Sequence, residues 1–217
     1  MNILNINYIV FTLWDYKASL VELLGIIFNF FSIYLMTIDN VLNWPIGIVG
    51  SIFFATLFYQ VQLYSEVVQQ VFFFIAGFYG WWMWSKLRRT TGNDQKKDAA
   101  IQYLTIKNRI ICGIVILIGS LIMGYIMQNI SSWLPRYSLI SASFPYLDAF
   151  VVMSSFIALF MISNKKIESW YLFAFIYAIL MGINWSKELY VMVIFFILLF
   201  ILAVKGIVNW HKMIVNR

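Results

Sequence analysis

Seven long runs of the sequence contain no charged residue, and this feature limits the possible folds more than any other. A helix needs about 20 predominantly apolar residues to cross the hydrocarbon core of a bilayer. The runs are Leu23–Ile38, Asn40–Ser65, Val67–Ser85, Ile110–Pro135, Ala149–Asn164, Ser169–Ser186 and Leu189–Val204. Their apolar residues cover all faces and do not alternate with polar ones, so they predict seven membrane-spanning helices and not β-barrel strands.

Composition supports an all-α integral membrane protein and argues against an enzyme. Of the 217 residues, 63% are hydrophobic and 11% are charged, whereas a soluble domain is about half apolar and about a quarter charged. A single cysteine, Cys112, excludes an intrachain disulfide and a cysteine-cluster metal site. The only histidine, His211, has no carboxylate or cysteine at metal-binding spacing, and no phosphate-binding glycine loop occurs. We therefore expect no catalytic residues, no metal and no cofactor.

The basic residues predict the orientation in the membrane. Lysine and arginine are retained in cytoplasmic loops. The twelve that fall on one side are Lys86, Arg88, Arg89, Lys96, Lys97, Lys107, Arg109, Lys165, Lys166, Lys205, Lys212 and Arg217; the three on the other are Lys17, Arg136 and Lys187. This asymmetry predicts an N-terminus outside and a C-terminus in the cytoplasm. The net charge of +6 is then mostly a topology signal, and not a sign of nucleic-acid binding.

Two segments lie outside the predicted spans. Met1–Trp14 is apolar but rich in asparagine, which favours an element that lies along the membrane interface without crossing it. It lacks the basic start and the small-residue cleavage site of a signal peptide. Thr90–Lys97 is polar and linker-like, and is predicted to be a mobile cytoplasmic loop.

A shift of 126 residues aligns the two halves of the chain without gaps. The coinciding pairs are Glu22 with Asp148, Phe30 with Phe156, Trp44 with Trp170, Leu63-Tyr64 with Leu189-Tyr190, Phe74-Ile75 with Phe200-Ile201, Gly80 with Gly206, Trp84 with Trp210 and Lys86 with Lys212. Matches of Phe and Ile arise easily between apolar helices, so coincidence is the alternative. Two tryptophan pairs and an acidic pair in one register favour a true internal repeat.

The repeat predicts a 3+1+3 arrangement within a single transmembrane domain, residues 1–217. Residues 18–86 and 144–212 would each form a three-helix repeat. Residues 87–143 would supply a cytoplasmic loop and a linker helix, Ile110–Gln128, which restores the chain direction and makes the two repeats parallel. Parallel repeats are a known plan of secondary transporters.

Polar side chains within membrane helices are costly, and they are therefore functional candidates. In the third run, Glu66, Gln70, Phe74 and Trp81 share one helical face by spacing. An amide beside aromatic rings suits a neutral, planar solute that forms hydrogen bonds. The alternative is that Gln70 only bonds a neighbouring helix. Asn29 of the first run is a weaker candidate.

The sixth run carries a second face of the same kind. It contains Trp170, Phe173, Tyr177 and Asn184, and aromatic rings attract planar or cationic rings. The alternative for Trp170 is an interfacial aromatic belt, and for Trp84 the belt is the favoured interpretation.

Two other functional classes are compatible with seven helices. A proton-coupled carrier would use Glu66, and a ligand or retinal receptor would need a lysine deep in the membrane. Lys205 lies near the predicted cytoplasmic end, where a lysine is expected to extend its ammonium group to the interface.

Several motifs between Glu22 and Trp210 resemble those of the PnuC vitamin transporters. In the first half they are Asn43-Trp44-Pro45-Ile46-Gly47, Phe58-Tyr59-Gln60, Gln62-Leu63-Tyr64, Gln70 and Tyr79-Gly80-Trp81-Trp82-Met83-Trp84; in the second they are Tyr146-Leu147-Asp148-Ala149 and Lys166-Ile167-Glu168-Ser169-Trp170-Tyr171. The resemblance implies a SWEET-like 3+1+3 fold, a homotrimer in a bacterial inner membrane, and facilitated diffusion of nicotinamide riboside. A cytoplasmic kinase that phosphorylates and so traps the substrate is an expected metabolic partner.

The resemblance extends unevenly to the site residues. Gln70 and Trp170 match the family's glutamine and first tryptophan. The second tryptophan and the asparagine that usually follow are replaced within Phe173-Ala174-Phe175-Ile176-Tyr177, and Met83 stands where a glutamine is common. Related branches are thought to carry thiamine, riboflavin or deoxynucleosides, and these remain alternative substrates. Gln70 would bind a polar edge, Trp170, Phe173 and Tyr177 would enclose the ring, Trp81 would help to close the cavity, and Asn29 and Asn184 would bind sugar hydroxyls.

Overall fold

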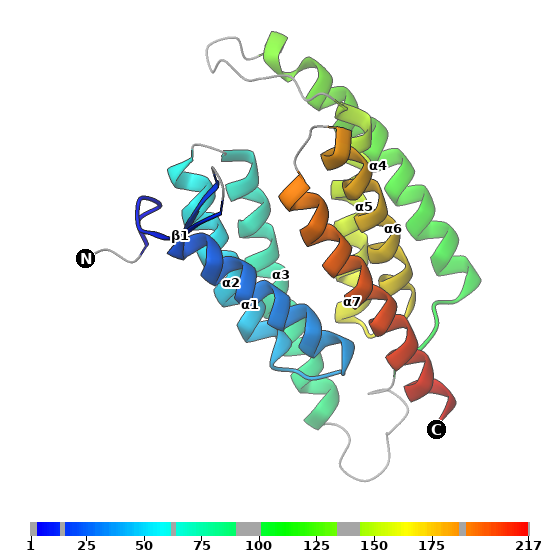
Figure 1. Cartoon of the computed structure of the whole chain (residues 1–217). Helices are drawn as coiled ribbons and strands as arrows, with labels where there is room; N and C mark the ends of the chain where they lie inside the picture. The colour runs from blue at the N-terminus through cyan, green and yellow to red at the C-terminus, as the bar shows by residue number, and fades with distance from the viewer. Residues whose placement is uncertain are drawn as a thin grey trace. The chain divides into compact units, whose positions relative to one another are not determined.

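The computed structural model describes residues 4–13, 16–61, 64–89, 101–133, 144–186 and 190–216 (Figure 1). This part of the chain contains seven helices, as predicted. They are α1 (Leu20–Thr37), α2 (Asn43–Gln60), α3 (Tyr64–Arg89), α4 (Ile106–Trp133), α5 (Pro145–Ser163), α6 (Glu168–Ser186) and α7 (Tyr190–Val215). The segment Thr90–Lys97, predicted to be a mobile loop, lies outside the described residues.

The helices form two compact units, Met1–Ala100 and Ile101–Arg217. In the first unit α2 packs against both α1 and α3. In the second unit α5 packs against α4 and α6, and α6 packs against α7. The first unit thus holds three helices and the second holds four, and the predicted 3+1+3 arrangement stays a prediction. The parallel direction of the two repeats and the division at residues 18–86, 87–143 and 144–212 stay predictions.

Five of the helices are long and apolar enough to cross a membrane, which makes the chain a multi-pass membrane protein. These are α1, residues Ile106–Asn129 of α4, α5, α6 and residues Met192–Val215 of α7. The other two helices, α2 and α3, fall short because they contain Asn43, Pro45, Gln69, Gln70 and several Trp and Tyr residues, which have low hydropathy. Of the seven predicted spans, those of α2 and α3 stay predictions.

Charged residues end the apolar runs but do not end the helices. The predicted seventh run stops before Lys205, whereas α7 continues to Val215 with Lys205 exposed. Lysine is a good helix former, and Lys212 in the last turn complements the negative end of the helix dipole. Similarly, α4 starts four residues before the predicted run, because the Thr105 Oγ1 accepts a hydrogen bond from the Asn108 N–H (3.3 Å).

The N-terminal segment forms a β-hairpin, which the sequence analysis did not predict. Strands β1 (Ile9–Leu13) and β2 (Tyr16–Ser19) pair antiparallel. Strand β1 is rich in β-branched and aromatic residues, which favour extended backbone. The hairpin leads directly into α1, whose N-cap Ser19 accepts a hydrogen bond from the Glu22 N–H (3.3 Å).

The residues before the hairpin are held against the end of α2. The Gln60 Nε2 donates to the Leu4 carbonyl (2.6 Å), and the Gln60 Oε1 accepts from the Ile6 N–H (2.9 Å). One amide thus satisfies two backbone groups of an irregular segment. That Met1–Trp14 lies along the membrane interface stays a prediction.

The internal repeat is visible in the tertiary structure. The rings of Trp44 and Trp84 meet edge to face at 5.5 Å and 86°, and those of Trp170 and Trp210 meet at 5.7 Å and 86°. Each pair joins the second and third helices of its repeat, and the two pairs are 126 residues apart. All four side chains are at most 3% exposed. The interfacial-belt interpretation of Trp84 is therefore wrong, and the same burial argues against a belt position for Trp170.

A glycine receives the indole ring in each repeat. A Cβ placed on Gly80 would collide with the ring of Trp44, and one placed on Gly206 would collide with the ring of Trp170. Only the absence of a side chain allows this approach between neighbouring helices.

The turns between the first and second helices of the repeats also correspond. Asp39 has φ 55° and Lys165 has φ 52°, and both follow the C-cap of their helix. A left-handed backbone is unusual for lysine, so its recurrence in the register of 126 residues makes coincidence between apolar helices a poor explanation for the repeat.

We predict that Gly206→Ala lowers the apparent melting temperature of the protein. The added methyl group must displace the Trp170 indole, and overpacking typically costs about 1–3 kcal/mol. Gly182→Ala is the matched control, since nothing lies within 4 Å of a Cβ at that position, and alanine stabilises a helix interior relative to glycine by about 0.5–1 kcal/mol. Thermal unfolding followed by size-exclusion chromatography compares the two variants. Equal melting temperatures would contradict the proposed close packing.

Candidate functional site

Gln70 is a buried amide in the first unit. Its side chain is 8% exposed, and its carboxamide makes no hydrogen bond with any described residue. Gly77, two turns along α3, packs against Ile48 of α2, so this side of α3 lies next to α2. The alternative function of Gln70, a hydrogen bond to a neighbouring helix, is thus not observed in the described part of the chain.

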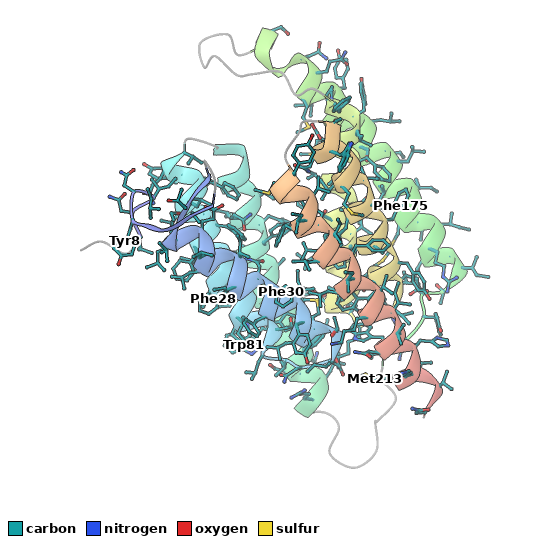
Figure 2. The ribbon with its side chains drawn as sticks, in the orientation of Figure 1. Tyr8, Phe28, Phe30, Trp81, Phe175 and Met213 are labelled. Carbon is teal, nitrogen blue, oxygen red and sulfur yellow. The ribbon has the colours of Figure 1, made fainter. Side chains whose placement is uncertain are left out.

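The aromatic residues of α3 continue from Gln70 toward the exposed side of the helix. Phe74 is half-buried and contacts Phe78 at a ring distance of 5.0 Å. Phe78 in turn lies 6.5 Å from Trp81, which is 40% exposed (Figure 2). Three- and four-residue spacing predicted that Trp81 shares a helical face with Gln70, and it did not identify Phe78. Glu66 belongs to α3, but its side chain lies outside the described residues.

Asn29 lies at the contact between α1 and α2. Its Nδ2 donates to the Gly25 carbonyl one turn earlier (3.1 Å). A Cβ on Gly50 of α2 would lie 2.6 Å from this Nδ2. The Asn29 amide therefore lies between α1 and α2. Its Oδ1 is the atom that can accept a further hydrogen bond.

The predicted aromatic face of α6 is a continuous row of rings. Trp170 and Phe173 lie 6.2 Å apart, and Phe173 stacks on Tyr177 at 6.0 Å with an interplanar angle of 13°. Tyr177 then stacks on Phe196 of α7 at 6.4 Å. The structure thus brings together three of the predicted residues. Phe196 was not predicted, because its proximity depends on how α6 and α7 pack.

Two buried polar atoms beside this row have no hydrogen-bond partner among the described residues. They are the Trp170 Nε1 and the Ser154 Oγ. Ser154 lies one turn from Val151 and from Ala158 of α5, the residues against which Phe173 and Tyr177 pack. Its neighbour Ser155, by contrast, bonds the Val151 carbonyl (2.8 Å). The only sequence signal for Ser154 is the pair of serines in an apolar run.

The indole of Trp44 shares the environment of Trp170. Its Nε1 is also buried without a partner among the described residues. The unpaired N–H is therefore common to both repeats and accompanies the packing of indole on glycine. Trp170 consequently has a structural function in addition to any contact with a solute.

Asn184 lies apart from the aromatic row of α6. It is seven residues beyond Tyr177, which corresponds to about 10 Å along the helix axis. Its Nδ2 donates to the Leu180 carbonyl (2.8 Å), so its Oδ1 is the atom available to a ligand.

The described candidates offer binding groups and no group suited to catalysis. They are aromatic rings, amides, a hydroxyl and indole N–H groups. In the described ranges, no cluster of three or more His, Cys, Asp or Glu residues could hold a metal ion. Such a set recognises a ring-bearing solute by stacking and hydrogen bonds.

Comparison with known proteins identifies relatives over most of the chain. The family described as "Nicotinamide mononucleotide transporter" matches residues 19–212. The chain is 26% identical over 210 residues to the nicotinamide riboside transporter PnuC of Escherichia coli (strain K12), which covers 90% of this chain and 86% of that protein; PnuC of Shigella flexneri matches with the same values. The crystal structure of the vitamin B3 transporter PnuC has a similar fold, with a TM-score of 0.66 and 15% identity over 90% of this chain and 82% of that one.

We predict that Gln70→Leu leaves the melting temperature of the ligand-free protein unchanged or raised. No hydrogen bond to a described residue is lost, and an apolar side chain replaces a polar one at a position that is 8% exposed. Ser32→Ala is the contrasting variant, because the Ser32 Oγ donates to the Asn43 carbonyl (2.8 Å) in a buried position, and its loss should destabilise by about 1 kcal/mol. If Gln70→Leu destabilises as much as Ser32→Ala, then Gln70 is a structural residue.

Proposed function

Since the chain belongs to the PnuC family of nicotinamide mononucleotide transporters, we propose that it imports nicotinamide riboside by facilitated diffusion. The family consists of membrane transporters and not of enzymes. The observation that carries the choice of solute is the uncharged Gln70 side chain, which is 8% exposed and makes no hydrogen bond with a described residue, on a helix rich in aromatic residues. A solute that reaches this amide can form a hydrogen bond for which no described residue competes.

The proposed contacts divide between ring and polar groups. In the first unit, Gln70 is the candidate to bond the carboxamide or another polar edge of the solute, with Phe74 and Trp81 as neighbouring rings and Asn29 as an acceptor for a ribose hydroxyl. In the second unit, Phe173 and Tyr177 are the candidates to stack on the ring, the Trp170 Nε1 is a candidate donor, and Asn184 is an acceptor for a ribose hydroxyl. Nicotinamide riboside carries a pyridinium charge, which aromatic faces attract by about 0.5–2 kcal/mol.

The riboside fits these residues better than the mononucleotide. A phosphate group requires basic side chains or a helix N-terminus. Among the described residues, the lysine or arginine nearest to Gln70 along α3 is Lys86 in the last turn, and none belongs to the row Trp170–Phe173–Tyr177. Lys205, which lies inside α7, is exposed. A phosphorylated solute would therefore lose its hydration without compensation.

The replacement of the family's second tryptophan and asparagine supports a second candidate. Phe173 and Tyr177 offer rings and one hydroxyl where those residues are usual. This polarity also suits thiamine, riboflavin or a deoxynucleoside, and polar recognition discriminates among solutes more strongly than ring contact does.

A binding panel on the purified protein tests the substrate. We expect isothermal titration calorimetry to detect binding of nicotinamide riboside and none of the mononucleotide. Gln70→Leu should weaken binding by about 10- to 100-fold, because a polar contact of the solute is lost. If only thiamine, riboflavin or a deoxynucleoside binds, the second candidate is correct and nicotinamide riboside is not the substrate.

The proposed transport is passive and is made one-way in the cytoplasm. Phosphorylation by a cytoplasmic kinase would convert the solute into an anion that the uncharged site does not accept. We further propose that the protein is a homotrimer, with its N-terminus outside a bacterial inner membrane. The excess of basic residues in one set of connecting segments supports this orientation.

Coupling to protons through Glu66 would be visible in proteoliposomes. We expect the initial uptake rate of labelled nicotinamide riboside to be the same with and without a pH gradient. Glu66→Gln should retain this behaviour, because a uniporter needs no titrating group. Uptake that collapses without the gradient in the unmodified protein, but not in Glu66→Gln, would establish a proton-coupled carrier.

A further inference from the structure

A groove of about 340 Å³ lies within the second unit, on a face that the proposed transport does not use. It runs between the first turns of α4 and the last turns of α5. Asn108, Asn164 and Lys166 line its polar end, and Ile111, Cys112 and Phe160 line its apolar part.

The polar end carries a positive charge. The Lys166 ammonium group donates to the Gln102 Oε1 (2.8 Å), a neutral acceptor, and no carboxylate of the described residues pairs with it. The nearby Glu168 is engaged elsewhere: its carboxylate pairs with the Arg109 guanidinium (2.7 Å) and accepts from the Leu104 N–H (3.0 Å). The positive end of the α4 dipole, in the turn of Asn108, adds to the attraction for an anion.

The apolar part continues into the membrane-facing surface of α4. Ile111 is 46% exposed and Phe160 is 57% exposed. Ile114, Leu117 and Ile118 extend the exposed apolar surface along α4, which is one of the helices able to span a membrane. An acyl chain can therefore lie against this surface while its head group remains at the polar end.

We propose that this groove binds one anionic phospholipid, with its phosphate at Lys166 and Asn108 and an acyl chain along Ile111, Cys112 and Phe160. The juxtaposition of this cation, a helix N-terminus and an open apolar channel selects this class of ligand. Basic pockets at the ends of membrane helices bind anionic head groups in this way. The inference does not depend on which solute is transported.

The chain provides its own probe, since Cys112 is its only cysteine and lies half-buried in the groove. The full-length protein is reconstituted in nanodiscs of phosphatidylcholine alone or with phosphatidylglycerol, and the rate of Cys112 alkylation by N-ethylmaleimide is measured by mass spectrometry. We expect phosphatidylglycerol to slow the reaction about fivefold, the effect of one basic residue near an anionic surface. Native mass spectrometry should also show phosphatidylglycerol retained on the protein.

Lys166→Gln keeps a hydrogen-bonding side chain but removes the charge, and should abolish both effects. Lys212→Gln is the matched control: it also removes one positive charge, but Lys212 does not line the groove. It lies next to His211, whose Nδ1 is 2.9 Å from the Tyr103 hydroxyl in the segment before α4, so it belongs to the same end of the unit. In Lys212→Gln, phosphatidylglycerol should still slow the alkylation of Cys112 and should still be retained on the protein.

Three outcomes would overturn the proposal. If Cys112 is alkylated equally slowly in nanodiscs of phosphatidylcholine alone and in those with phosphatidylglycerol, then charge has no function in the groove. If Lys166→Gln and Lys212→Gln reduce the slowing of alkylation and the retention of phosphatidylglycerol equally, the lipid is attracted only to a generally basic surface. Protection that rises with protein concentration and needs no anionic lipid would assign the groove to contact with a second copy of the chain.

Discussion

The packing of an indole ring against a glycine and a second indole is the contact on which each three-helix repeat depends. Helices in a bilayer gain little from burying apolar surface, because lipid is as apolar as their side chains. Their association needs close and specific packing instead. Gly80 admits Trp44 and Gly206 admits Trp170, and edge-to-face contact with Trp84 and Trp210 then fixes the angle of the rings. This junction positions α2 against α3 and α6 against α7.

Some polar groups in the two units have no hydrogen-bond partner among the described residues. The indole N–H of Trp170 and the hydroxyl of Ser154 are buried without a hydrogen bond to any described residue, and the Gln70 side chain is 8% exposed. Such groups reduce stability in an apolar environment. A transporter has a reason to retain them, because a solute entering from water must exchange its hydration for hydrogen bonds of similar strength.

Much of the architecture could be predicted because it follows from patterns along the sequence. Uncharged runs located the helices, and the spacing of 126 residues paired Trp44 with Trp170 before any contact was known. The hairpin at Ile9–Ser19 could not be predicted from hydropathy, which ignores strand pairing. The burial of Trp84 was misjudged because tryptophan beside lysine at a helix end is typical of an interfacial belt. Only the packing of α2 on α3 distinguishes the two environments.

The candidate site was predicted less completely than the fold. Helical spacing found Gln70 and the rings of Phe173 and Tyr177, since residues three and four apart share a face. It could not find Phe196, which reaches Tyr177 from another helix. It also could not distinguish Ser154 from Ser155, because the difference is a hydrogen bond made by one and not by the other. Tertiary contacts decide which polar residue stays available.

Counterflow in sealed proteoliposomes tests the central claim most directly, because it separates a carrier from a receptor or a pore. Vesicles loaded with unlabelled nicotinamide riboside are diluted into a trace of labelled solute, with no ion gradient. The account predicts that label accumulates transiently above its equilibrium level in vesicles with the unmodified protein, and far less in vesicles with Gln70→Leu. Equilibration without an overshoot would indicate a pore, and no protein-dependent flux of nicotinamide riboside or of the alternative solutes would contradict the assignment as a carrier.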